Sequence, residues 1–158
     1  MAVDLKKWAL LAEIFGGVGI IISVLYLGYQ VSENTTNIQA ANALSISSET
    51  MASRQSLIDD ADLADLVLKG RSETDRDVLT GNERFRFFAY TLNRLTIWEN
   101  LLLMNKQGLL PDEFFGPLDS GHCVNFRQPG YRFVWQGFAR NYFSDDLKKR
   151  VDECFADE

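Results

Sequence analysis

The sequence predicts an all-α protein: one N-terminal transmembrane helix that continues into a helical stalk, followed by a small C-terminal helical bundle. Three observations favour this fold class. A long uncharged segment lies near the N-terminus, apolar residues recur at three- and four-residue spacing in later segments, and strand signals are nearly absent. We divide the chain into a transmembrane helix at 8–32, a stalk with a short acidic helix at 33–79, and an aromatic-rich bundle at 80–158.

Composition limits the function classes. The 158 residues are 46% hydrophobic and 24% charged, which is ordinary for a folded protein and unlike a disordered chain. The formal net charge is -6. Nucleic-acid binders need a basic face to neutralise phosphates, so we expect no nucleic acid among the partners.

The transmembrane prediction depends on the segment Ile14–Ser32, which holds 19 residues without a charge. As a helix rising ~1.5 Å per residue it is about 28 Å long, close to the hydrocarbon thickness of a bilayer. Trp8 at one end and Tyr26 with Tyr29 at the other suit the two membrane interfaces.

Two other interpretations fit this segment less well. A buried core helix of a soluble protein seldom runs this long without charge. A cleaved signal peptide has a shorter apolar region, and the nearest small-residue site, near Ala41–Ala43, lies well beyond the segment. The sequence therefore favours a lipid bilayer as the first partner of the chain.

The predicted orientation follows from the basic residues that flank the span. Lys6 and Lys7 precede it, whereas no Lys or Arg follows until Arg54. Because basic flanks stay inside, we expect a cytoplasmic N-terminus and an extracytoplasmic C-terminal domain.

The span also contains small residues at four-residue spacing, which let two helix backbones approach closely. We predict helix packing in the membrane through Ala12, Gly16, Gly19 and Ser23.

The stalk is expected to continue the spanning helix as far as Asp59-Asp60, because residues 33–58 contain neither Pro nor Gly. Its apolar stripe is thin and buries little area by itself. It therefore needs a partner, either the C-terminal half or a copy of itself. The stripe consists of Ile38, Ala41, Leu44, Ser48, Met51, Gln55 and Ile58.

A short acidic helix is expected over Asp59–Lys69, ended by Gly70 and followed by a charged loop at 71–79. Thr80 and Glu83 have capping-box spacing, which predicts that a long helix begins there and reaches Gln107. Its predicted core stripe is Phe85, Phe88, Leu92, Leu95, Glu99 and Leu102, widened by Phe87, Trp98 and Leu101.

The remaining elements are a short helix over Pro111–Leu118, a loop over Gly121–Gln128, a helix that begins at Pro129-Gly130, and a final helix from Ser144 or Asp145 to about Phe155. Tyr131, Trp135, Phe138 and Tyr142 form an aromatic stripe after Pro129. Of the 19 aromatic residues, 15 lie beyond residue 80, so we expect the core in the C-terminal part.

Motifs for catalysis, cofactors and metals are missing from the sequence. His122 is the one histidine, no Gly-x-Ser-x-Gly elbow accompanies it, and we expect it in a loop, exposed or locally bonded. Zinc-type cysteine or histidine pairs and phosphate-binding loops do not occur, and Asp75 with Asp77 lacks the rest of a calcium loop. We therefore predict no catalytic, cofactor-binding or metal-ligating residues.

Glu99 is the residue that stands out, because it interrupts an apolar stripe beside Trp98. A buried carboxylate is costly unless it is paired, and Arg140 is one possible partner. The carboxylate either fixes helix packing through an ion pair or backbone bond, or forms the floor of a pocket around Trp98, Trp135 and Tyr131.

The two cysteines, Cys123 and Cys154, leave two alternatives open. In an extracytoplasmic domain they can form a disulfide that ties the loop to the last helix. Two inert buried thiols fit the sequence equally well.

Several short segments resemble a group of small bacterial proteins of unknown function with one N-terminal span and a helical C-terminal region. The similar segments are Leu25-Tyr26-Leu27-Gly28-Tyr29-Gln30, Glu33-Asn34-Thr35, Trp98-Glu99-Asn100, Gly108-Leu109-Leu110, Pro129-Gly130 and Trp135. The resemblance implies this architecture and a bacterial inner membrane, and no activity. Members of the group often carry basic residues just after the span, where this chain has Ser32 and Glu33.

From these observations we expect a non-enzymatic, membrane-anchored interaction or scaffold protein that forms a homo-oligomer or joins a larger membrane complex. The alternative is a membrane-anchored sensor or small-ligand-binding module, whose aromatic pocket lies in the C-terminal bundle.

Overall fold

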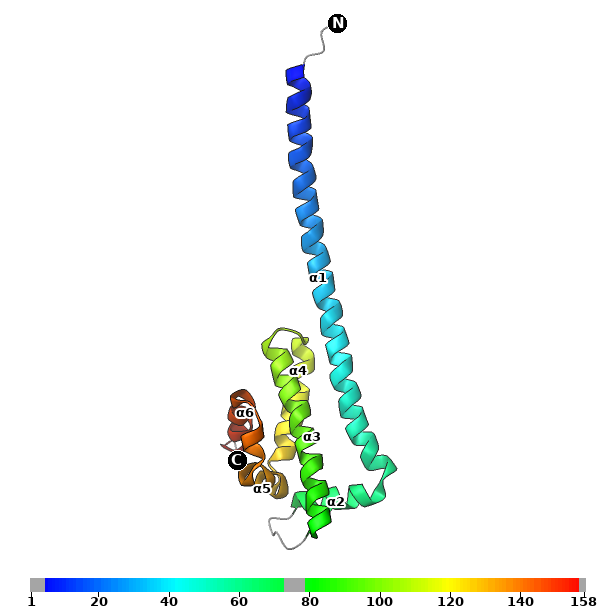
Figure 1. Ribbon diagram of the computed structural model, residues 1–158, viewed down its shortest axis with the longest axis vertical. Helices are drawn as coiled ribbons and strands as arrows, with labels where there is room; N and C mark the ends of the chain where they lie inside the picture. The colour runs from blue at the N-terminus through cyan, green and yellow to red at the C-terminus, as the bar shows by residue number, and fades with distance from the viewer. Residues whose placement is uncertain (1–4, 73–78, 157–158) are drawn as a thin grey trace. The chain divides into compact units, whose positions relative to one another are not determined.

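The computed structural model describes residues 5–72 and 79–156, and within these ranges the chain is helical with no strand (Figure 1). The all-α prediction is confirmed. The chain divides into two units, Met1–Ile38 and Gln39–Glu158, and helix α1 (Leu5–Asp59) contributes to both. The stalk from Gln39 onward and the acidic helix after it thus belong to the same unit as the aromatic-rich bundle.

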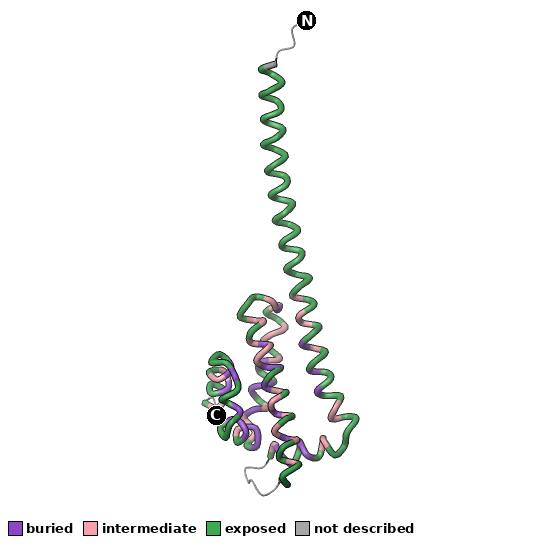
Figure 2. Tube along the Cα trace, in the orientation of Figure 1, coloured by how far each residue is buried: buried purple, intermediate pink, exposed green. Residues whose placement is uncertain are grey.

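The first unit is the N-terminal part of α1, and its described side chains are all exposed (Figure 2). An 18-residue window in α1 has a mean hydropathy of 2.2 with none of it buried, so this helix is a candidate membrane span by length and composition. Ser23 Oγ donates to Gly19 O at 2.8 Å, and Thr35 Oγ1 donates to Val31 O at 2.9 Å. These hydroxyls are therefore satisfied within the helix.

In the second unit, the C-terminal part of α1 packs one face into the hydrophobic core. Ile46 is 1% exposed, and Thr50 and Ser53 beside it on the helix are also buried. Gln39 Nε2 donates to Gly108 O at 3.0 Å, and Asn42 Nδ2 donates to Leu109 O at 3.2 Å. The polar start of the stalk is thus bonded to the turn at Gly108 and Leu109, which follows the helix that begins at Gly81.

Helix α2 (Ala61–Ser72) passes through Gly70, so the predicted stop at Gly70 is wrong. Gly70 is buried, and a Cβ placed on it would lie 2.6 Å from Cδ2 of Phe87. A Cβ on Gly130 would in turn collide with the carbonyl oxygen of Gly70. The glycine thus allows close helix contact and does not end the helix. Of the loop expected at 71–79, residues 73–78 lie outside the described part.

Helix α3 (Gly81–Lys106) confirms the predicted start and end of the long helix. Thr80 Oγ1 accepts from Glu83 N at 3.4 Å, and Glu83 Oε2 accepts from Thr80 N at 2.7 Å, which completes the capping box. The backbone hydrogen bond from Thr80 is the main reason that the pKa of Glu83 is lowered.

The buried side of α3 differs in part from the predicted stripe. Phe85 is 70% exposed, while the buried residues are Phe87, Thr91, Leu95, Ile97, Trp98 and Leu101. Helix α3 contacts α2 and three later helices, so its core surface is wider than a single stripe (Figure 1).

Helix α4 (Asp112–Phe126) runs through the segment that was expected to be a loop from Gly121. Asp119, His122, Cys123 and Phe126 are its buried residues, and this spacing of three and four is that of one helix face. Burial of that face keeps the segment helical, although Pro117 inside the helix lacks an N–H to donate.

The chain ends in α5 (Pro129–Gly137), a 3-10 turn (Ala139–Tyr142) and α6 (Asp145–Ala156). Pro129 lies in the first turn of α5 as expected. The predicted aromatic stripe is therefore divided between α5 and the 3-10 turn. Trp135 and Tyr131 are buried at 1% and 5% exposure, whereas Tyr142 is 66% exposed.

Candidate functional site

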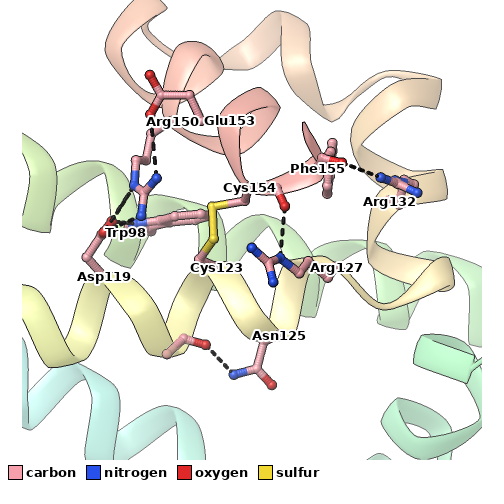
Figure 3. Close-up of a disulfide and its surroundings, with 11 residues drawn as sticks. Trp98, Asp119, Cys123, Asn125, Arg127, Arg132, Arg150, Glu153, Cys154 and Phe155 are labelled. Atoms are coloured by element: carbon pink, nitrogen blue, oxygen red, sulfur yellow. Dashed lines mark hydrogen bonds and ion pairs between the residues drawn. A yellow bond between two sulfur atoms is a disulfide. The ribbon is translucent and has the colours of Figure 1, made fainter. Parts of the chain in front are cut away.

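The bundle contains a buried polar centre where α3, α4 and α6 meet (Figure 3). Trp98 Nε1 donates to Asp119 Oδ1 at 2.8 Å. Arg150 approaches the same carboxylate from α6, with Nε 3.0 Å and Nη2 2.7 Å from Oδ2. The Asp119 side chain is 8% exposed and that of Arg150 is 28% exposed. The carboxylate is thus both paired and hydrogen-bonded, as a buried charge requires.

A disulfide between Cys123 and Cys154 lies next to this centre and joins α4 to α6 (Figure 3). The structure therefore presents the first of the two alternatives that the sequence left open. The end of α6 is fixed further by arginines, since Arg127 Nε donates to Cys154 O at 2.9 Å and Arg132 Nη2 donates to Phe155 O at 3.2 Å. Such contacts satisfy carbonyls that the last helical turn leaves unpaired.

His122 is buried in α4, at 4% exposure, and is not the loop residue that the sequence predicted. Its ring stacks on Trp98, with ring centroids 5.5 Å apart. Burial, together with the positive charge of Arg94, lowers the pKa of His122 to about 4, against the opposing effect of Asp119. At neutral pH the ring is therefore an uncharged part of the core.

Glu99 is half-buried, and its Oε1 accepts a 2.7 Å hydrogen bond from the backbone N–H of Ser144. It therefore links α3 to the residue before α6. Of the roles that the sequence suggested for Glu99, this contact corresponds to the backbone hydrogen bond that fixes helix packing. Trp135 and Arg140 share one carboxylate: Trp135 Nε1 is 3.2 Å from Asp152 Oδ1, and Arg140 Nη2 is 2.8 Å from Oδ2. The hydrogen bond from Arg140 is the main reason that the pKa of Asp152 is lowered.

A groove with aromatic walls lies between α3 and α5, with a volume of about 450 Å³. Phe88 and Phe138 stack there with centroids 4.2 Å apart, and Phe85 leaves 70% of its surface exposed. The groove differs from the predicted pocket, because Trp98, Trp135, Glu99 and Arg140 do not line it. It is lined by Gly81, Arg84, Phe85, Phe87, Phe88, Phe133, Val134, Gly137 and Phe138.

A second exposed apolar surface lies on the stalk. We call it the stalk face and define it as Ala41, Leu44, Ser48, Met51, Gln55 and Ile58, all of which are exposed. These residues belong to the thin stripe predicted from the sequence. The bundle packs against a different side of the same helix, the one that carries Ile46.

The small residues predicted to pack in the membrane, Ala12, Gly16, Gly19 and Ser23, are all exposed on α1. A Cβ added to Gly16 or Gly19 would meet nothing within 4 Å. This surface is thus open to another helix, although Ser23 is already bonded to its own backbone.

Among residues 5–72 and 79–156, no group of three or more His, Cys, Asp or Glu side chains is placed to hold a metal ion. Asp75 and Asp77 lie outside the described residues. In the buried centre, Trp98, Asp119 and Arg150 are bonded to one another.

Sequence reasoning missed Asp119 and Arg150, which form the centre. It named Phe85, Phe88 and Phe138 as members of apolar stripes but did not predict that they line a groove. The spacing of Asp119, His122, Cys123 and Phe126 was a usable signal, because it marks one helix face. For Arg150 the sequence carries no such signal, since its partner lies on another helix.

Comparison of the chain with protein-family models, with curated proteins and with solved structures finds no match.

Proposed function

We propose that the chain is a membrane-anchored interaction or scaffold protein that acts by binding and not by catalysis. The observation that carries the proposal is the N-terminal part of α1, where an 18-residue apolar window has no buried residue. A soluble protein rarely leaves so large a continuous apolar surface in water. A lipid bilayer covers it without any further folding.

The proposed location is the inner membrane of a bacterium, with the N-terminus in the cytoplasm. Lys6 and Lys7 support this orientation, because basic residues favour the cytoplasmic side. The Cys123–Cys154 disulfide supports it independently, since such bonds persist in oxidising compartments. In this orientation a small disulfide-bonded bundle lies outside the cytoplasm, where a partner can reach it.

Fractionation of cells that produce the full chain tests the anchor. We expect the protein to pellet with the membranes, to resist an alkaline wash and to dissolve in detergent. Ile21→Arg combined with Val24→Arg places two charges within the span, each costing about 3 kcal/mol at the bilayer centre, and should move a large fraction to the supernatant. Val124→Arg, at a 63% exposed bundle position, is the matched control and should stay in the pellet. An unaltered chain that stays in the supernatant without detergent would contradict the proposal.

The orientation has its own test. A reporter that is active only in the cytoplasm, fused after Glu158, should be inactive. Thiol alkylation of the unreduced protein should give no mass shift, and reduction should expose both cysteines.

The interaction role is tested by amine-reactive crosslinking in native membranes. We expect species larger than one chain. Monomer alone, at a crosslinker concentration that joins a known membrane dimer, would contradict a scaffold role.

A second candidate function is a sensor or small-ligand-binding module, which the aromatic groove favours. Its volume of about 450 Å³ lies within the range of small-molecule sites, and its walls are largely apolar. Binding of the fluorescent apolar probe anilinonaphthalene sulfonate should weaken in Phe85→Ser and remain unchanged in Val124→Ser, because both positions are exposed but only Phe85 lines the groove. Equal binding in both variants would remove this candidate.

A further inference from the structure

The stalk face is opposite to the side of α1 that the bundle covers. Leu44, Met51 and Ile58 are 72%, 67% and 74% exposed. The buried residues Ile46, Thr50 and Ser53 lie on the other side of the helix, because each residue turns the chain by about 100°. The sequence offered two partners for this stripe, the C-terminal half or a copy of the same stalk. The C-terminal half packs elsewhere on the helix.

The stalk face has the spacing of a coiled-coil seam. Leu44, Met51 and Ile58 are separated by seven residues and occupy the d positions of successive heptads. The a positions then fall on Ala41, Ser48 and Gln55. Two of these are small, which allows a second helix to approach closely, and the third is polar, which helps to fix the register.

Charged residues beside the seam distinguish a parallel from an antiparallel pair of helices. In this register Arg54 occupies a g position and Asp59 the e position of the next heptad. In a parallel pair of identical helices, a g residue faces the following e residue of the other chain, so Arg54 faces Asp59 on both sides. In an antiparallel pair, g faces g and e faces e, so Arg54 and Asp59 no longer face each other and their attraction is lost.

We infer that the stalk face binds the stalk face of a second copy of this chain in a parallel, in-register pair. The inference rests on the proposed membrane anchor, because two chains inserted in the same orientation run parallel and are concentrated in one plane. Three large apolar side chains per stalk bury less area than the roughly 1,200 Å² that stable soluble interfaces need. Confinement to the membrane raises the effective concentration of the two stalks and so favours pairing through a small interface.

Disulfide crosslinking of the full chain in its membrane tests the pair. The two native cysteines are bonded to each other, so Met51→Cys or Leu44→Cys introduces a single free thiol. We expect mild oxidation to give a reducible dimer at least fivefold more abundant for each of these variants than for Glu49→Cys. Glu49 is exposed on the same part of α1 but lies outside the stalk face, which makes it the matched control. Equal yields at the three positions would overturn the inference.

Charge exchange tests the parallel register. Arg54→Asp in the Met51→Cys background should lower the crosslinked fraction at least threefold, because it places two acidic residues opposite each other. Adding Asp59→Arg to the same chain should restore the yield. A double exchange that fails to restore it, while the protein still pellets with membranes, would overturn the register.

The two proposals fail in different ways. If the chain stays in the supernatant, the membrane anchor is wrong. If it pellets with membranes and Met51→Cys gives only monomer under oxidation, the anchor stands and the stalk pair is wrong.

Discussion

Trp98 and Asp119 are joined across the bundle by a 2.8 Å hydrogen bond from the indole Nε1 to the carboxylate Oδ1. Trp98 is fully buried in α3, and Asp119 lies on α4. Since Arg150 of α6 binds the same carboxylate, one acidic side chain connects three helices. This carboxylate therefore helps to fix the position of α3, the helix that forms one wall of the aromatic groove.

The first prediction concerns this carboxylate. Asp119→Asn keeps the size of the side chain but removes the buried charge that pairs with Arg150, which then keeps only its 3.5 Å ion pair with the more exposed Glu153. We expect a loss of about 3 kcal/mol in the free energy of unfolding, the usual cost of breaking a buried pair. Asp146→Asn is the matched control, because the Lys106–Asp146 pair is 66% and 58% exposed. It should change stability by less than about 0.5 kcal/mol in a denaturant titration. Equal losses in the two variants would show that the centre contributes no special stability.

The second prediction concerns the disulfide. Cys123 and Cys154 are 31 residues apart, and closing a loop of that length stabilises a fold by about 3–4 kcal/mol in the chain-entropy description. Replacing both cysteines by alanine should lower the Tm of the detergent-solubilised protein by several degrees. Reductant should lower the Tm of the native chain and leave that of the variant unchanged, which separates the bond from the effect of the substitutions. A native chain whose Tm does not respond to reductant and whose thiols alkylate freely would contradict the bond.

The third prediction concerns the contact between α2 and α5. A Cβ on Gly130 would collide with the backbone of Gly70, and backbone cannot move aside as a flexible side chain can. We expect Gly130→Ala to cost about 1–3 kcal/mol, the range of overpacked cores. Gly137→Ala lies on the same helix, where a Cβ meets nothing within 4 Å, and it should be neutral or slightly stabilising. Thermal unfolding of the two variants side by side measures the difference, and similar Tm values would contradict the close packing.

The elements that the sequence predicted correctly are those with local causes. The start of α3 depends on Thr80 and Glu83, three residues apart, and both halves of that capping box are present. The end of α1 at Asp59 and the start of α5 at Pro129 likewise follow from nearby residues. Such contacts form within one or two turns, so the sequence contains all of their partners together.

The incorrect predictions have tertiary causes. Gly70 fits a helix end by local rules, yet it allows a close approach by Gly130 from much later in the chain. The Gly121–Gln128 segment looked like a loop, yet burial of His122 and Phe126 against Trp98 keeps it helical. Asp119 and Arg150 are 31 residues apart, so nothing in their local sequence indicates the pair.

The last prediction concerns pH. Burial and Arg94 lower the pKa of His122 to about 4 in the folded chain, against 6.5 for an unperturbed histidine. Between pH 6.5 and pH 4, His122 therefore takes up a proton in the unfolded chain but stays neutral in the folded chain. This contribution to stability is complete above pH 6.5 and is lost as the pH falls toward 4, by about 3 kcal/mol in total. His122→Phe keeps an aromatic ring beside Trp98 and cannot titrate, so its unfolding free energy should fall less between pH 7 and pH 4.5 than that of the native chain. Denaturant titrations at the two pH values measure both losses, and equal losses would show that His122 is not a source of the acid sensitivity.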